Sequence, residues 1–228
     1  MLWDIDGTLV NTAGHGRHAF MQAFEAVFGQ PPGIDDVPMA GRTDHAISRD
    51  LLKANGVSDP ETHVPRMFEE LHGALVGRKE LMASQGSAQP GVREALEHLG
   101  ARADVLQSLL TGNIEANAEV KLAAFGLESL VDLEIGGYGS DHITRSELVG
   151  VARRKVLERR GVDVAPAQTV IVGDTPLDID AAHAAGARAV AVATGPFSSE
   201  ELRQAGPDAT LEDARDIAAL VAALGLPE

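Results

Sequence analysis

Cysteine is absent from this 228-residue chain, and so is any long apolar run. The lack of cysteine excludes disulfide bonds, thiolate nucleophiles and cysteine-ligated zinc, and it fits a reducing compartment. No apolar stretch approaches the roughly 18–20 residues that cross a bilayer, and no basic segment followed by an apolar core marks a signal peptide. The sequence therefore predicts a cytoplasmic protein with no membrane partner.

Basic residues are also scarce, since 19 Lys and Arg stand against 34 Asp and Glu, giving a formal net charge of −15. Such a field disfavours binding to nucleic acid and to anionic membranes, so we expect neither as a partner. The same field repels phosphorylated molecules at long range. A site that binds one would need local positive charge from a metal ion and a few basic side chains.

The first ten residues, MLWDIDGTLV, are the most informative part of the chain. A short apolar run leads to Asp4 and Asp6, and a Gly-Thr turn follows at once. Ligands bind at the carboxyl ends of strands in a parallel α/β sheet, and side chains two residues apart in a strand point to the same side. Both carboxylates can therefore face one site, where they would hold a divalent cation well. A solvated acidic turn after an edge strand is the alternative interpretation.

The rest of the chain alternates apolar runs with helical patterns, which predicts a parallel sheet with helices on both faces. We expect strands at residues 105–110, 133–135, 169–172 and 189–192, and helices at residues 114–125, 145–160, 181–185 and 213–224. Residues 11–87 differ, because their pattern is helical and includes no strand. Helices are expected there at residues 18–28, 44–54 and 61–76, before a return linker at residues 84–91.

These patterns predict an α/β fold of two parts. The core is a three-layer, Rossmann-like parallel sheet formed by residues 1–10 and 88–228. A helical domain formed by residues 11–87 is inserted directly after the first strand. Only three residues precede Asp4, which predicts either a short first strand or a native start farther upstream.

Two further strand ends carry polar groups. Thr111, Gly112 and Asn113 lie between an expected strand and an expected helix, where a hydroxyl and backbone amides can bind a phosphate. Asn113 as a simple helix cap is an equally good interpretation. Farther along, Asp174 follows a strand and is placed to ligate a cation, while Asp178 could hold a metal-bound water or orient Asp174. Capping of the next helix is again the alternative.

A phosphoryl group in transfer carries spread negative charge and needs a fixed cation nearby. Our candidate is Arg145, at the start of an expected helix, where a basic residue is unfavourable to the helix dipole. A solvated Arg145 is the alternative. Lys121 is a rival for the same role, but its position in the middle of a helix favours a place on the surface.

In order and spacing, these motifs resemble those of the haloacid dehalogenase-like superfamily of phosphatases across essentially the whole chain. The helical insert resembles the first-position cap domain of that family. The resemblance, which extends to phosphoglycolate phosphatase and β-phosphoglucomutase-like proteins, implies a magnesium-dependent phosphatase acting on a small phosphorylated metabolite, as a monomer or weak homodimer. One departure is that the family usually has Lys where we place Arg145, and the two residues are not interchangeable.

The resemblance also implies a role for each motif. Asp4 would be the nucleophile that forms an aspartyl-phosphate, and Asp6 would be the general acid and base. The phosphate-binding set would be Thr111, Gly112, Asn113 and Arg145, with Thr111 and Arg145 also counted as catalytic. The Mg²⁺ set would be Asp4, Asp6 through its carbonyl, Asp174 and, from behind them, Asp178.

Other functions stay open at this point. A dehalogenase would not need Asp6, and a phosphonatase would need a cap lysine, for which only Lys53 and Lys79 are available. A phosphomutase is an alternative, and a non-catalytic binding module is less favoured because the nucleophile and the metal-binding acids are all present. Substrate choice is expected from the cap, where the candidates are Arg42 foremost and then His15, Arg17 and His18; each could instead be a surface residue.

Overall fold

A six-stranded parallel sheet forms the centre of the computed structural model, which describes residues 1–227. Its strand order is β5-β4-β1-β6-β7-β8. The strands are β1 (Leu2–Trp3), β4 (Ser108–Thr111), β5 (Gly137–Tyr138), β6 (Val170–Gly173), β7 (Arg188–Val192) and β8 (Ala209–Leu211). Because β1 lies between β4 and β6, the carboxyl ends of these three strands meet at one edge of the sheet.

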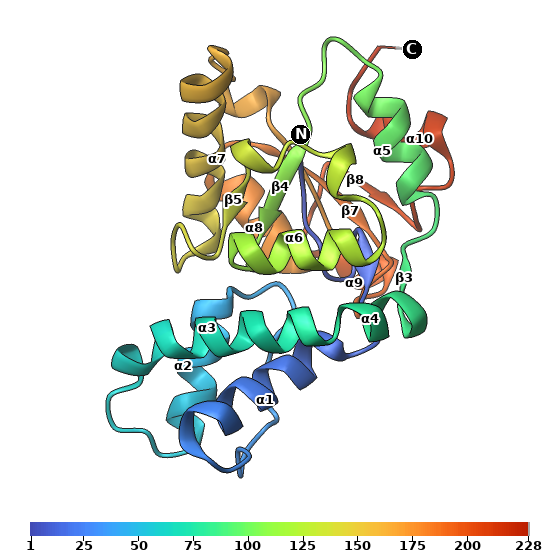
Figure 1. Cartoon of the computed structure of the whole chain (residues 1–228). Coiled ribbons are helices and arrows are strands. Elements are labelled where there is room, and N and C mark those ends of the chain that lie inside the picture. Colours follow the sequence, from blue (N-terminus) through green and yellow to red (C-terminus); the bar gives the residue numbers. More distant parts are fainter. Residues whose placement is uncertain (228) are drawn as a thin grey trace.

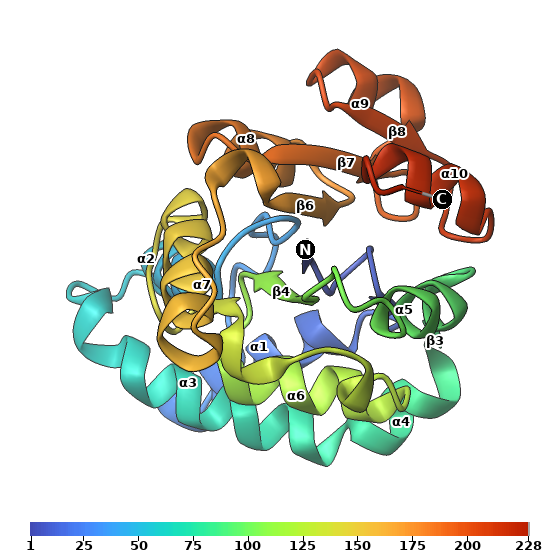
Figure 2. The ribbon, with the colours of Figure 1, turned by 90° about the horizontal axis from the view of Figure 1, so that it is seen from above.

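Helices cover both faces of the sheet, as Figure 2 shows in the view from above. Neighbouring residues of a strand point to opposite faces, and β1 follows this rule: Trp3 packs in the cluster under α5, α6 and α10, and Leu2 packs in the cluster under α7 and α8. The core helices are α5 (Val92–Gly100), α6 (Glu115–Ala124), α7 (Arg145–Arg160), α8 (Pro176–Ala184), α9 (Ser199–Gln204) and α10 (Ile217–Ala223). The predicted three-layer α/β fold is confirmed.

A second group of helices lies below the core in Figure 1. It consists of α1 (His15–Phe28), α2 (Asp44–Ala54), α3 (Pro60–Gly77) and α4 (Lys79–Gln85). These helices have an apolar cluster of their own, in which Phe20, Met67 and Leu71 are buried. The chain enters and leaves this group through a short antiparallel pair, β2 (Val10–Asn11) and β3 (Ser87–Ala88). We call this group of helices the cap, and our proposed boundaries between core and cap pass through this pair of strands.

Several element predictions hold and others need correction. The helix expected at residues 145–160 is α7, with the same ends. The strand expected at residues 133–135 is wrong: Leu133–Ile135 is a 3₁₀ turn capped by the Asp132 side chain, which accepts from Glu134 N, and the strand follows at Gly137–Tyr138. The segment at residues 84–91, expected to be a linker, contains the end of α4 and the strand β3. The insert was expected to hold no strand, but parts of β2 and β3 lie within it.

The sequence patterns also missed whole elements. These are α4, α5, α9 and β8, and the first turn of α8, which starts at Pro176 under the Thr175–Asp178 capping box. None of the helices within the described residues combines the length and the apolar character needed to cross a membrane.

Truncation of the cap cluster tests whether the cap packs as the structure shows. Leu71 is fully buried among cap helices, so we predict that Leu71→Ala lowers the free energy of unfolding by about 2–5 kcal/mol, from lost transfer energy and the cavity left behind. Urea unfolding measures this loss. Leu81→Ala is the matched control, because Leu81 is 43% exposed. Equal losses in the two variants would contradict the packing described.

Candidate active site

Asp4 lies at the carboxyl end of β1 and is buried. Its backbone N–H donates to Val172 O at 2.9 Å, so the pairing with β6 continues up to the carboxylate. The chain then turns at Gly7, where φ is 89°. A Cβ at Gly7 would lie 2.3 Å from Asp174 Oδ2, so only glycine fits between the two acidic strand ends.

Arg145 points from the start of α7 into this edge of the sheet. Its Nη2 lies 2.9 Å from Asp4 Oδ1 and 2.5 Å from Asp178 Oδ1, and it donates to Leu110 O at 3.1 Å. The side chain is 8% exposed, so the solvated alternative for Arg145 does not hold. Burial alone would lower the pKa of Arg145, but the carboxylates of Asp178 and Asp4 outweigh burial and raise it. The same carboxylates offset the unfavourable position at a helix start.

Three buried carboxylates surround one point. Asp4, Asp174 and Asp178 each offer a ligand oxygen, and these oxygens lie within 4.8 Å of one another. Thr8 donates to Asp174 Oδ1 at 2.7 Å, while Asp174 Oδ2 is buried and has no hydrogen-bond partner among the described residues. Asp178 differs, because one oxygen accepts from Arg145 and the other from the Thr175 hydroxyl and amide. Asp178 therefore orients its neighbours, and Asp174 has an oxygen free for a cation.

The pKa values of two carboxylates in this cluster are raised mainly by burial, and neighbouring negative charge adds to the effect. Burial, Asp4 and Asp178 raise the pKa of Asp174 to about 8 in the metal-free protein. Burial also raises the pKa of Asp4 to about 6, although Arg145 acts in the opposite direction. An oxygen-only ligand set with one unpartnered, buried carboxylate oxygen fits a hard divalent cation such as Mg²⁺.

A cavity of about 230 Å³ opens above this cluster, between the core and the cap. Asp6 faces it, with a side chain that is 43% exposed. From the core the lining residues are Asp4, Asp6, Thr111, Gly112, Asn113 and Lys121. From the residues after β1 and the cap they are Thr12, Gly16, Arg17, Phe20, Met39, Ala40, Gly41, Asp44 and Ile47.

The loop after β4 contributes Thr111, Gly112 and Asn113 to the cavity. Asn113 donates through Nδ2 to Asp6 Oδ2 and to Thr111 Oγ1, both at 2.8 Å. Asn113 is not the N-cap residue of α6, because the helix begins after Ile114. The N–H of Ile114 donates to the carboxylate of Asp44, which belongs to the helical insert. The alternative in which Asn113 only caps a helix therefore does not describe this loop.

The expected surface position of Lys121 is wrong. Lys121 is 5% exposed, and its Nζ lies 2.6 Å from Asp6 Oδ2 and 2.7 Å from Asn113 Oδ1. It lies four residues after Asn117, which is also buried, so one face of α6 carries two buried polar groups. Polar residues at helical spacing on an otherwise apolar face were the signal in the sequence.

The cap candidates separate into two groups. Arg17 lines the cavity, with its guanidinium held by the carbonyls of Asp35 and Val37. Arg42 is not in the lining; its guanidinium bonds to Asp50 at 2.5 Å and to Pro38 O. This geometry corrects the expectation that Arg42 reaches over the site.

The two histidines expected to help choose the substrate are also outside the lining. His15 is buried between Gln85 and Arg78, and His18 is exposed beside it. The sequence did not single out the cap residues that do line the cavity, which include Phe20, Met39, Asp44 and Ile47.

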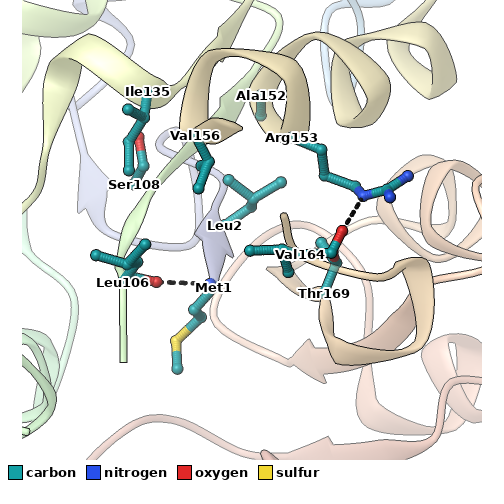
Figure 3. Close-up of a pocket in the computed structure, with 10 residues that line it drawn as sticks. All are labelled: Met1, Leu2, Leu106, Ser108, Ile135, Ala152, Arg153, Val156, Val164 and Thr169. Atoms are coloured by element: carbon teal, nitrogen blue, oxygen red, sulfur yellow. Dashed lines mark hydrogen bonds between the residues drawn. The ribbon is translucent and has the colours of Figure 1, made fainter. Parts of the chain in front are cut away.

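A second, smaller cavity of about 30 Å³ lies at the amino ends of the strands (Figure 3). It is lined mostly by apolar side chains, and the Met1 amine there donates to Leu106 O at 2.7 Å. Burial lowers the pKa of this amine to about 6. None of the clustered carboxylates reaches this cavity, so the cavity above Asp4 is the candidate active site.

Residues 1–192 match the family described as haloacid dehalogenase-like hydrolase. The chain belongs to this family. The expectation of a haloacid dehalogenase-like enzyme is thereby confirmed, and the acidic strand ends described above lie within the matched residues.

Relatives of known name are similar over nearly the full length. The chain is 28% identical to a probable phosphatase, IndB, of Dickeya dadantii, covering 98% of this chain and 94% of that protein. It is 27% identical to a phosphoglycolate phosphatase of Haemophilus influenzae, covering 92% of each. A hydrolase from Pseudomonas syringae superposes with a TM-score of 0.67 at 22% identity, covering 97% of this chain and 96% of that one. A putative β-phosphoglucomutase from Thermotoga maritima gives 0.58 at 23% identity, covering 96% of each chain.

The unpartnered oxygen of Asp174 leads to a prediction that does not depend on activity. We expect Mg²⁺ to raise the melting temperature of the wild-type protein and to have little effect on Asp174→Asn. Thermal unfolding with and without Mg²⁺ measures this shift. Asp180→Asn is the matched control, because Asp180 is exposed two residues beyond the cluster. A full shift in Asp174→Asn would contradict the assignment.

The stabilisation of the wild-type protein by Mg²⁺ should increase with pH. Because the pKa of Asp174 is raised to about 8, protons compete with the cation below that value, and the metal-free fold loses stability as pH rises from about 4 towards 8. We therefore predict that the gain in melting temperature from Mg²⁺ grows between pH 6 and pH 8.5. A gain that shrinks over this range would oppose the raised pKa.

Proposed function

We propose that the protein is a magnesium-dependent phosphatase that hydrolyses a small phosphorylated metabolite through an aspartyl-phosphate on Asp4. The observation that carries this proposal is the position of Asp4: Arg145 holds one of its oxygens, the residue lines the cavity, and it shares an acidic cluster with Asp174, one oxygen of which is unpartnered. A carboxylate so fixed is oriented for attack, and covalent catalysis divides a difficult hydrolysis into two easier steps.

In the first step, Asp4 attacks phosphorus while the ester oxygen leaves and takes a proton from the Asp6 carboxyl. Thr111, Gly112 and Asn113 line the cavity where the phosphoryl oxygens would lie. Their donors, together with the Arg145 guanidinium, stabilise the charge on those oxygens in the transition state. In the second step, Asp6 takes a proton from water as that water attacks phosphorus, and the bond to Asp4 breaks.

The residues that would hold Mg²⁺ are Asp4, the Asp6 carbonyl and Asp174, with Asp178 orienting the cluster through Arg145 and Thr175. When bound, the cation offsets the charge of the carboxylates and of the phosphoryl group, which lets one approach the other. The cap contributes by closing over the cavity and excluding water during the first step.

The names of the relatives suggest where a substrate search should begin. Two of the similar proteins are a phosphoglycolate phosphatase and a putative β-phosphoglucomutase, so a phosphomutase is the second candidate. A cavity of about 230 Å³ restricts the whole substrate to a small molecule. We also propose a cytoplasmic protein that is a monomer or weak homodimer and, given its net charge of −15, does not bind nucleic acid.

The nucleophile is tested by Asp4→Asn in an assay with a panel of phosphorylated metabolites and Mg²⁺. We predict that this variant folds and loses nearly all turnover, because an amide is too weak a nucleophile to attack phosphorus. Release of inorganic phosphate is measured, and a search for a second phosphorylated product distinguishes phosphatase from phosphomutase. Turnover near that of the wild type in Asp4→Asn would remove the proposal.

Arg145 gives a second test of the same site. We predict that Arg145→Ala costs about 2–4 kcal/mol of transition-state stabilisation in kcat/KM, by analogy with lost oxyanion donors. Arg145→Lys should recover part of this loss, since the charge returns without the forked geometry. Arg153→Ala is the control, because Arg153 lies on the same helix, bonds to Val164 O and does not line the cavity above Asp4. Equal losses at the two positions would oppose the role of Arg145.

A further inference from the structure

Lys121 forms an ion pair with Asp6 that is separate from the pair between Arg145 and Asp4. Its Nζ lies 2.6 Å from Asp6 Oδ2, and Asn113 Nδ2 donates to the same oxygen at 2.8 Å. Asn113 Oδ1 in turn accepts from Lys121 at 2.7 Å, which closes a small ring of three polar groups. Asp4 and Asp6 therefore each pair with a different basic side chain.

The burial of Lys121 requires a reason beyond folding. The Lys121 side chain is 6% exposed, whereas the side chain of its partner Asp6 is 43% exposed and lines the cavity. A buried ion pair is weak evidence for stability, because the cost of removing charges from water can exceed the attraction between them. An apolar residue at this position of α6 would avoid the cost of burying an ammonium group.

We propose that Lys121 is a positioning residue that holds the Asp6 carboxyl for proton transfer to the leaving group. Lys121 and Asn113 both bind Oδ2, so Oδ1 is the oxygen left to act on the substrate in the cavity. This inference rests on the proposed phosphatase function. When Asp4 attacks, the P–O bond to the leaving group breaks and the bonding electrons stay on the ester oxygen. Asp6 Oδ1, which carries the proton taken from water in the preceding hydrolysis step, transfers that proton to the ester oxygen.

The proposal predicts a dependence on the leaving group that a structural role would not produce. An alkyl phosphate needs its leaving oxygen protonated, whereas p-nitrophenolate leaves as a stable anion. In Lys121→Met we expect kcat/KM to fall by about 10²-fold or more on a small alkyl phosphate, because general acid catalysis contributes a factor of that size. On p-nitrophenyl phosphate we expect kcat/KM to fall by less than about tenfold. kcat/KM is the measurement, because it reports the steps up to departure of the leaving group.

Three further variants complete the experiment. Lys121→Arg should recover part of the loss on the alkyl ester, because the charge is restored. Asp6→Asn should show the same contrast between esters, and Lys121→Met added to Asp6→Asn should cause no further loss, since both changes remove one function. Lys53→Met is the matched control, because Lys53 is exposed at the end of α2.

Equal losses on the two esters, or losses that add in the double variant, would overturn the role of Lys121 and leave the phosphatase proposal intact. A Lys121→Met protein that fails to fold moves the test to Lys121→Arg, which must then retain the contrast between esters at a smaller size; no contrast there would also overturn it. A wild-type protein that hydrolyses neither ester with Mg²⁺ would overturn both proposals.

Discussion

The pairing of Arg145 with two buried carboxylates is the interaction on which the rest of the site depends. Asp4, Asp174 and Asp178 lie close enough to repel one another strongly in a dry environment, and Arg145 neutralises one of their three charges. The remaining charge of the ionised cluster is −2, which a divalent cation balances. Burial is the main cause of the raised pKa of Asp174, and the charges of Asp4 and Asp178 raise it further.

The topology of the sheet makes this concentration of charge possible. Because β1 lies between β4 and β6, three strand ends from distant parts of the sequence deliver their polar groups to one edge. Close approach then requires small residues, and a Cβ on Gly7 or Gly195 would lie within 2.3 Å of Asp174 Oδ2. The absence of side chains at these two positions thus leaves the room that the Asp174 carboxylate occupies at the strand ends.

The sequence predicted the parts of this site that depend on local patterns. An apolar run followed by acids identified Asp4 and Asp174, since the end of a buried strand is where the next polar residue must lie. For Lys121 the helical spacing from Asn117 was the only signal, and its partner Asp6 became evident only from the tertiary contact. For Arg42 there was no signal, because Asp50 holds it within the cap. The 3₁₀ turn at residues 133–135 was predicted to be a strand, because a segment of three residues is too short to show a distinct periodicity.

Helix α6 belongs to the core, but it bonds to a carboxylate of the cap at its start and to the Asp6 carboxylate through Lys121. The Asp44 carboxylate, from the cap, accepts from Ile114 N at 2.9 Å and from Asn117 Nδ2, so it lies at the N-terminal end of a core helix, where the helix dipole favours negative charge. Burial raises the pKa of Asp44 to about 6, with Lys121 acting in the opposite direction. One turn beyond Asn117, the same helix presents Lys121 to Asp6. Asp44 and Lys121 both line the cavity, so one core helix connects a carboxylate of the cap with the Asp6 carboxylate across it.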